Sequence, residues 1–302
     1  MKFKQVLILH FVFVLSLTIS FISNAQNTEL NVETLLPNFP ANGFLNVDKD
    51  GNLYASEYGV FTQIGGSGTR LYKISPHGKL LDSITSLSGP IGTLKDSKGN
   101  LYINNDNDTK RSIILKIDKE GNQTPFAEVK GWPIGMKIDK KGNIYLTNYN
   151  TPNIYKIDQT GLVSTFIKHD DFIGSAGIDF DSKGNLIIAN FATAKVFSVK
   201  PNGKIREIAH LEDIVKQGWG IGHLTVLDDY IYATGIVVNK IFKISLEGKV
   251  EIFAGNGEGK TKDGSLMNAA LNYPNGITSD KFNKILYISE YGPNGGIRKI
   301  QL

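Results

Sequence analysis

Short apolar runs alternate with polar turns along almost the whole chain. Residues 137–157 contain one cycle of this pattern: an apolar run, the turn Asp139-Lys140-Lys141-Gly142-Asn143, a second run, a polar loop, and a third run at Ile154–Ile157. In such a turn the Asp side chain can bond the backbone two residues on, and Gly adopts the left-handed conformation that closes a hairpin. The pattern therefore predicts three short antiparallel strands.

This cycle recurs six times along the chain. A few residues after the turn stands a Tyr in five copies and an Ile in one: Tyr54, Tyr102, Tyr145, Ile187, Tyr232 and Tyr287. Successive members are 42 to 55 residues apart, and five copies continue through a further Gly turn into a fourth apolar run. Four short antiparallel strands in a unit of this length are typical of a β-propeller blade. The sequence therefore predicts an all-β fold, a six-bladed β-propeller with four antiparallel strands per blade.

The two ends of the chain are expected to complete the last blade together. The sixth copy stops at Leu302, directly after its third strand at Ile297–Ile300, whereas residues 29–36 form an extra strand ahead of the first copy. We expect residues 29–36 to pair beside Ile297–Ile300, which closes the ring and covers an exposed sheet edge. The blades expected within a single domain, 26–302, are 43–88, 89–130, 131–172, 173–214, 215–268, and 269–302 with 29–36.

Two segments interrupt the strand pattern. His210–Gln217 predicts a short helix between the fourth and fifth blades. Gly255–Asn272 is an insertion before the sixth blade, with a helical turn expected at Leu266–Leu271. Insertions between blades lie on the rim or over the channel mouth, where binding usually occurs.

The first 25 residues differ from the rest. Lys2 and Lys4 give a basic start, Val6–Ile22 is mostly apolar, and Ser23 and Ala25 provide small residues ahead of a cleavage point. This pattern predicts a signal peptide, 1–25, and a secreted or periplasmic protein with no membrane span after cleavage. The alternative is an uncleaved anchor, because an apolar run of this length is at the short end of a membrane span.

Composition narrows the range of partners. The chain has no Cys, so any metal site must use oxygen or His ligands. The formal net charge is +4, and removal of residues 1–25 takes away two lysines and leaves +2. A net charge this close to zero gives no reason to expect a nucleic-acid partner. We expect a monomer that binds a small molecule, a glycan or a peptide. A protein partner at the rim of the propeller is also compatible with the sequence.

The last copy and the chain as a whole resemble known propeller families. The residues that carry the first resemblance are Phe253–Gly257, Asp263-Gly264, Ala269-Ala270, Asn272–Ile277, Leu286–Ile288 and Ile297–Ile300. Together they resemble an NHL-repeat blade. More loosely, residues 29–302 resemble the six-bladed group of senescence-marker/gluconolactonase lactonases, strictosidine-synthase-like proteins and virginiamycin B lyase. The resemblance implies the fold, but this fold hosts both enzymes and binding scaffolds.

The gluconolactonase resemblance also implies a divalent metal at the channel mouth. In those enzymes Glu, Asn and Asp ligands lie at the tops of the innermost strands, often just before a Gly. The matching positions, judged by spacing to the turn, are Gly43, Ile91, Ile134, Ala176, Ile221 and Asn275. Only Asn275 offers a side-chain oxygen, whereas a hard cation needs six or more. The sequence therefore predicts no cofactor at these positions.

The ends of the second strands are the best candidates for a binding site. They lie on the face opposite the tight turns and read Glu57-Tyr58, Asn105-Asp106, Asn148-Tyr149, Asn190-Phe191, Gly235-Ile236 and Glu290-Tyr291. We expect their polar and aromatic side chains, with Trp219 and Asn275, to surround the channel mouth and bind a ligand. The alternative is that the Asn and Glu side chains bond loop backbone and shape the turns.

Three residues decide between binding and catalysis. Glu57 and Glu290 stand on neighbouring blades of a closed ring, so we expect them to be close and able to share a proton or hold Ca²⁺ or Mg²⁺. His223 enters the innermost strand of the fifth blade and is the candidate general base, because an unperturbed His titrates near neutral pH. Its alternative role is a channel-lining His bonded to the next blade.

The sequence therefore supports two functions. The leading hypothesis is a non-enzymatic module that binds a small molecule, glycan or peptide at the channel mouth. Its rival is a metal-assisted hydrolase or lyase that acts on a lactone or cyclic ester, with a cation at Glu57 and Glu290 and with His223 as base.

Overall fold

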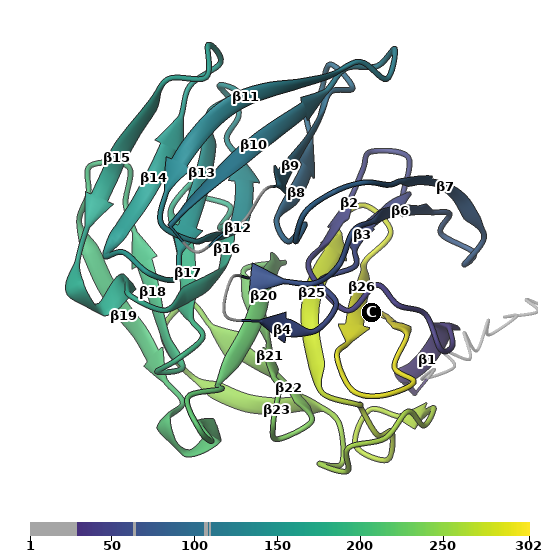
Figure 1. The fold of residues 1–302 in the computed structure, drawn as a ribbon. Coiled ribbons are helices and arrows are strands. Elements are labelled where there is room, and N and C mark those ends of the chain that lie inside the picture. Colours follow the sequence, from purple (N-terminus) through teal and green to yellow (C-terminus); the bar gives the residue numbers. More distant parts are fainter. Residues whose placement is uncertain (1–28, 63–64, 106–107, 109) are drawn as a thin grey trace, which may run out of the picture.

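Six antiparallel sheets surround a central channel in the computed structural model (Figure 1). The structure describes residues 29–62, 65–105, 108 and 110–302. The predicted signal peptide and Asp106 lie outside the described residues. Within the described part of the chain, no helix is long and apolar enough to cross a membrane.

Each blade contains four antiparallel strands, and the last blade is completed by β1 (Asn31–Leu36), which precedes the first blade in the chain. Blade one comprises β2 (Leu45–Val47), β3 (Leu53–Ser56), β6 (Leu71–Ile74) and β7 (Leu80–Ile84). Blade two comprises β8 (Thr93–Lys95), β9 (Leu101–Asn105), β10 (Arg111–Ile117) and β11 (Gln123–Lys130). Blade three comprises β12 (Pro133–Ile138), β13 (Ile144–Asn148), β14 (Asn153–Ile157) and β15 (Val163–Lys168).

The second half of the ring repeats this arrangement. Blade four comprises β16 (Ser175–Phe180), β17 (Leu186–Asn190), β18 (Lys195–Val199) and β19 (Ile205–His210). Blade five comprises β20 (Ile221–Leu227), β21 (Tyr230–Gly235), β22 (Lys240–Ser245) and β23 (Val250–Ala254). Blade six comprises β25 (Pro274–Asp280), β26 (Ile285–Glu290), β27 (Ile297–Gln301) and β1 (Asn31–Leu36), with the short β24 (Gly264–Ser265) at its edge. The innermost strands contact one another in the order β2, β8, β12, β16, β20, β25 and back to β2, which confirms the six-bladed ring.

The tight turns form as the sequence predicts. Asp139 Oδ1 accepts hydrogen bonds from the backbone of Lys141 at 2.8 Å and of Asn143 at 2.9 Å, and Gly142 has φ +83°. A side chain that satisfies two backbone N–H groups fixes the hairpin between the first and second strands. These turns lie at one end of the channel, which we call the turn face, and the ends of the second strands lie at the other, the mouth face.

The predicted closure of the ring is confirmed. Strand β1 pairs antiparallel with β27, with Val32 opposite Ile300, and its other edge is covered by β24. Val32 has no exposed surface and packs in the core of the last blade with Ile277 and Leu286. Burying a Val side chain stabilises a fold by roughly 1.5 kcal/mol or more, so the N-terminal strand is part of the core.

The two interrupting segments contain little helix. The only helical residues within His210–Gln217 are a single 3-10 turn, η2 (Glu212–Ile214), and a second such turn, η1 (Asp170–Phe172), follows β15. The expected turn at Leu266–Leu271 begins one residue earlier, because the backbone N–H groups of Asn268 and Ala269 both bond to Ser265 O. The insertion therefore serves mainly to bring β24 beside β1.

One position in the innermost strands is Gly in four blades and aromatic in two. The strand pairings align Gly92, Gly135, Gly177 and Gly276 with Phe44 in blade one and His223 in blade five. A Cβ at Gly135 would collide with the backbone oxygen of Ala176 in the next blade, so Gly allows the strands to approach. The same alignment corrects the metal-ligand comparison in blade five, where the matching residue is Gly222 and not Ile221.

Phe44 and His223 fill the middle of the channel. Their rings meet edge to face with centroids 5.1 Å apart, and they are 1% and 2% exposed. Blade six stands between blades one and five, so this contact crosses the channel. The contact between these two rings separates the half of the channel at the mouth face from the half at the turn face.

Candidate functional site

A closed belt of aromatic side chains surrounds the channel on the mouth face. The members of this aromatic belt are Phe61, Trp132, Tyr149, Phe191, Trp219 and Tyr291. Successive ring centroids are 5.4, 5.4, 6.0, 5.5 and 5.7 Å apart, and the Phe61 N–H donates to the Tyr291 hydroxyl at 3.3 Å. Aromatic rings at these separations stabilise one another, so the belt is a preformed wall.

The sequence identified four members of the belt and missed two. Tyr149, Phe191 and Tyr291 follow second strands and Trp219 precedes β20, as predicted. Trp132 also precedes the innermost strand of its blade, which begins at Pro133. Phe61 lies in an insertion within blade one and has no counterpart in the other repeats.

A hairpin from blade one reaches over the mouth. It consists of β4 (Phe61–Thr62) and β5 (Gly65–Gly66), and Figure 1 shows β4 in front of the channel. Phe61 contacts Trp132 of blade three and bonds Tyr291 of blade six, which are opposite blades. Beneath it Tyr58 is 6% exposed, and burial, with Tyr291 and Tyr149 nearby, raises the pKa of its hydroxyl. The hairpin is therefore a roof over part of the belt.

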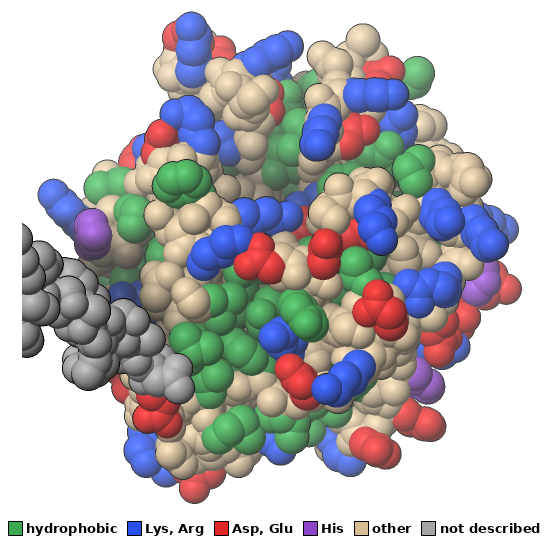
Figure 2. Space-filling view, turned by 180° about the vertical axis from the view of Figure 1, so that it is seen from behind, with side chains coloured by type: hydrophobic (Ala, Val, Ile, Leu, Met, Phe, Trp, Pro, Cys, Tyr) green, Lys and Arg blue, Asp and Glu red, His purple; other side chains and the backbone are tan. Residues whose placement is uncertain are grey.

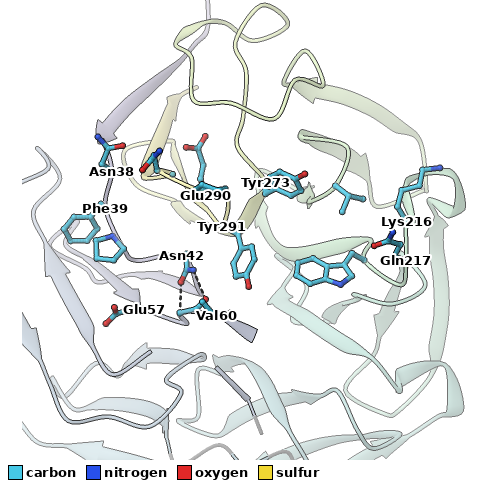
Figure 3. A pocket seen from close by; sticks show the side chains of 18 residues that line it. Asn38, Phe39, Asn42, Glu57, Val60, Lys216, Gln217, Tyr273, Glu290 and Tyr291 are labelled. Atoms are coloured by element: carbon cyan, nitrogen blue, oxygen red, sulfur yellow. Dashed lines mark hydrogen bonds between the residues drawn. The ribbon is translucent and has the colours of Figure 1, made fainter. Parts of the chain in front are cut away.

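Beside the belt lies a cavity of about 830 Å³ between blades five, six and one (Figure 3). Trp219, Tyr273 and Tyr291 form its aromatic side, and Phe39 lies on the side of the N-terminal segment. Its polar lining includes Asn38, Asn42, Glu57, Lys216 and Gln217. This size and mixture are typical of ligand pockets, which measure roughly 300–1,000 Å³ and combine apolar walls with a few polar groups.

Glu57 is the carboxylate of this cavity that lacks partners. Its Oε2 is shielded from solvent, and no donor among the described residues lies within hydrogen-bond distance of it. An unsatisfied buried oxygen normally costs about 1–3 kcal/mol, and such atoms are rare in folded proteins. Because this oxygen is shielded, a hydroxyl or ammonium group in the cavity would supply the missing donor once the Glu57 side chain turns toward it.

Glu290, by contrast, is fully engaged. It is 1% exposed and accepts hydrogen bonds from Arg298 Nη1 at 2.7 Å, from Thr261 Oγ1 at 2.6 Å and from the Asn272 N–H at 3.0 Å. Arg298 also bonds Asp263, which accepts from Thr34 of β1. Glu290 therefore holds the closure of blade six together.

The residues present do not fit the divalent metal site that the resemblance implies. Glu57 and Glu290 were expected to be close; they line the same cavity, but Figure 3 shows their carboxylates on different sides of it. The Asn275 side chain donates to Asn42 O at 2.9 Å. Among the residues that the structure describes, no group of three His, Asp or Glu side chains could hold a metal ion.

The predicted mouth amides bond to loop backbone. Asn148 and Asn190 have no exposed surface. Asn148 Oδ1 accepts from the Trp132 N–H at 3.1 Å, and Asn190 Nδ2 donates to two carbonyl oxygens of the η1 loop at 2.7 and 2.8 Å. Asn105 Oδ1 accepts from the Ser88 N–H at 2.7 Å. These side chains shape the loops, which is the alternative that the sequence analysis left open.

His223 lies below the belt, inside the channel. Burial, followed by the positive charge of Lys137, lowers its pKa to about 3. Its Nδ1 has no hydrogen-bond partner among the described residues. A His that stays neutral and shielded from the mouth does not suit the role of general base for a ligand at the belt.

Comparisons with known proteins support the fold. No family model matches the chain, and no curated protein matches it. Among solved structures, an auxiliary nutrient binding protein from Bacteroides ovatus is 17% identical over 90% of this chain and 76% of that chain, with a TM-score of 0.71. A gluconolactonase from Xanthomonas campestris is 12% identical over 90% and 89%, with a TM-score of 0.63. Virginiamycin B lyase from Staphylococcus aureus is 16% identical over 91% and 100%, with a TM-score of 0.59. Identities this low show a shared six-bladed fold alone.

Proposed function

We propose that this protein is a secreted or periplasmic binding protein for a small hydroxyl-rich molecule, such as a mono- or oligosaccharide, which occupies the cavity beside the aromatic belt. The observation that carries the proposal is that one cavity is lined both by Glu57, whose Oε2 has no partner among the described residues, and by the aromatic side chains of Trp219 and Tyr291. Sugars have apolar ring faces that stack on aromatic side chains and hydroxyls that donate to carboxylates. The cavity is lined by aromatic side chains for the first interaction and by a carboxylate for the second.

Two further observations favour a nutrient ligand outside the cytoplasm. The basic and apolar start of the chain has the pattern of a signal peptide. Two solved structures of similar fold, from Bacteroides ovatus and Bacteroides thetaiotaomicron, are described as auxiliary nutrient binding proteins. Binding without catalysis is favoured because Glu290 is paired with Arg298 and His223 is buried.

Calorimetric titration of the mature chain against sugars, short peptides and lactones tests the proposal. We expect a sugar to bind and the Glu57→Gln variant to weaken it by at least about tenfold, because hydrogen bonds to charged groups contribute roughly 1.5–3 kcal/mol. Glu128→Gln is the matched control, since Glu128 lies on the outer strand β11 and its side chain is 61% exposed.

The outcomes separate the alternatives. Sugar binding that is unchanged in Glu57→Gln would overturn the assignment of the site. Binding of peptides alone would overturn the ligand class. Turnover of a lactone in the presence of added Ca²⁺ or Mg²⁺ would overturn the non-enzymatic function.

A further inference from the structure

The channel has a second cavity at its other end, on the turn face. Its volume is about 1030 Å³, and eight Lys and five Asp residues line it. Lys137 lies on the innermost strand of blade three, and Lys281 lies in the tight turn of blade six. Because these blades stand opposite each other in the ring, their side chains meet over the channel axis.

Lys137 and Lys281 share a single carboxylate. Asp179 Oδ1, on blade four, lies 3.6 Å from Lys137 Nζ and 3.9 Å from Lys281 Nζ. Both distances exceed those of an ordinary N–H···O bond, about 2.7–3.2 Å. The two ammonium groups therefore keep N–H donors that the carboxylate does not use.

Asp179 is already satisfied by other groups. Its Oδ2 accepts from Thr225 Oγ1 at 3.0 Å and from the Val226 N–H at 2.9 Å, and its Oδ1 accepts from the Phe180 N–H at 2.8 Å. Burial alone would raise the pKa of Asp179, but Lys137 and Lys281, together with the backbone N–H groups of Val226 and Phe180, hold this pKa below its usual range. One negative charge therefore faces two positive charges.

Of the two lysines, Lys137 is the more buried, with a side chain that is 16% exposed against 57% for Lys281. Burial lowers the pKa of the Lys137 ammonium group, Asp179 opposes this shift, and Lys281 adds to it. An anion between the two nitrogens would stabilise both charges.

The other carboxylates of the cavity are bound within their own turns. Asp139, Asp181 and Asp280 each accept two backbone N–H groups and one Asn side chain. Asp48 accepts similar bonds and also pairs with Lys95 at 3.2 Å. Among the described residues none of these four carboxylates forms an ion pair with Lys137 or Lys281, and eight Lys against five Asp leave the cavity lining with an excess of positive charge.

We propose that the turn-face cavity is a binding site for a small organic anion, whose phosphate or carboxylate group lies between Lys137 and Lys281. Phe180 lines the cavity, and Phe282 at its rim is 92% exposed, so both can contact the apolar part of such a ligand. Figure 2, the view from behind, shows basic side chains scattered among acidic ones around a hydrophobic centre, which favours a small anion over a long polyanion. Phe44 and His223 separate this cavity from the mouth, so the inference does not rest on the proposed sugar site.

Titration of the full mature protein with glucose 6-phosphate, citrate, inorganic phosphate and neutral glucose tests the inference. We expect saturable binding of at least one organic anion that weakens as salt is added and falls at least about tenfold in Lys281→Gln. Lys281 is chosen because its side chain is 57% exposed and its loss should leave the fold intact, and Lys249→Gln, 81% exposed on the outer edge of blade five, is the matched control.

The comparison of ligands identifies the anionic group. Stronger binding of glucose 6-phosphate indicates a phosphate site, and stronger binding of citrate indicates a carboxylate site. The absence of saturable binding for every anion, or equal affinity in wild-type protein, Lys281→Gln and Lys137→Gln, would overturn the inference.

Both tryptophans of the chain, Trp132 and Trp219, lie on the mouth face. Anion binding at the turn face should therefore leave tryptophan emission unchanged, and a change that accompanies binding would also contradict the assignment.

Discussion

Phe44 and His223 occupy equivalent positions on blades one and five, and their rings meet across the channel at 85° with centroids 5.1 Å apart. The other four blades have Gly at this position. The two aromatic rings divide the channel into a mouth half, with the belt and Glu57, and a turn half, with Lys137 and Asp179. A ligand in one half has no contact with a ligand in the other, so the two proposed sites can be tested separately.

The buried His223 should make the stability of the protein depend on pH. In the unfolded chain a His titrates near pH 6.5, whereas in the folded protein its pKa is about 3. Between these values the unfolded state binds a proton that the folded state does not, so stability falls as the pH falls. The slope is about 1.4 kcal/mol per pH unit, which gives a loss of about 2 kcal/mol between pH 7 and pH 5.

Urea unfolding of wild-type protein and His223→Leu at both pH values measures this contribution. Leu has a similar size and no charge, and the other titrating groups are the same in both proteins. We expect the loss of stability between pH 7 and pH 5 to be about 2 kcal/mol smaller in the variant. An equal loss in the two proteins would show that His223 has the same pKa in the folded and unfolded states.

The ring closure should depend on Arg298. This residue is fully buried and bonds Glu290 at 2.7 Å and Asp263 at 2.8 Å. Removing one partner of a buried ion pair typically costs about 3–5 kcal/mol, because the other charge stays buried without compensation. Arg298→Met should therefore reduce the free energy of unfolding by this amount.

The adjacent Lys299 provides a matched control for Arg298. Its ammonium group pairs with Glu33 of β1 at 3.0 Å, but the two side chains are 34% and 56% exposed. Exposed pairs contribute about 0–1 kcal/mol, so Lys299→Met should be nearly neutral in the same urea experiment. Similar costs for the two substitutions would contradict a specific role of the buried network.

The sequence was sufficient to predict the fold because the blade signals are local. The Asp139–Gly142 turn and its copies use hydrogen bonds within five residues, which sequence spacing reveals directly. The pairing of β1 with β27 followed from counting strands, since a blade with three strands leaves an open edge.

The site was harder to predict because it depends on contacts between blades. Asn148 and Glu290 occupy equivalent ends of second strands, yet Asn148 accepts from the backbone N–H of Trp132 ahead of β12, whereas Glu290 accepts from an Arg of the next strand. Nothing in the repeat pattern indicates that Phe61 would cross the mouth to Tyr291. The contact of Phe44 with His223 follows only from strand register, because the turn after β20, counted between equivalent strand pairs, is one residue shorter than the turn after β12, which places His223 at the position of Gly135.

The central claim is that the cavity beside the belt binds a hydroxyl-rich molecule, and tryptophan fluorescence tests it most directly. The chain has only two Trp residues, and both belong to the belt. We predict that titration with the cognate sugar changes the emission in a saturable way, and that the titration of Glu57→Gln needs at least about tenfold more sugar. Sugar binding detected by calorimetry with no change in emission, or the same titration curve in Glu57→Gln, would contradict the account.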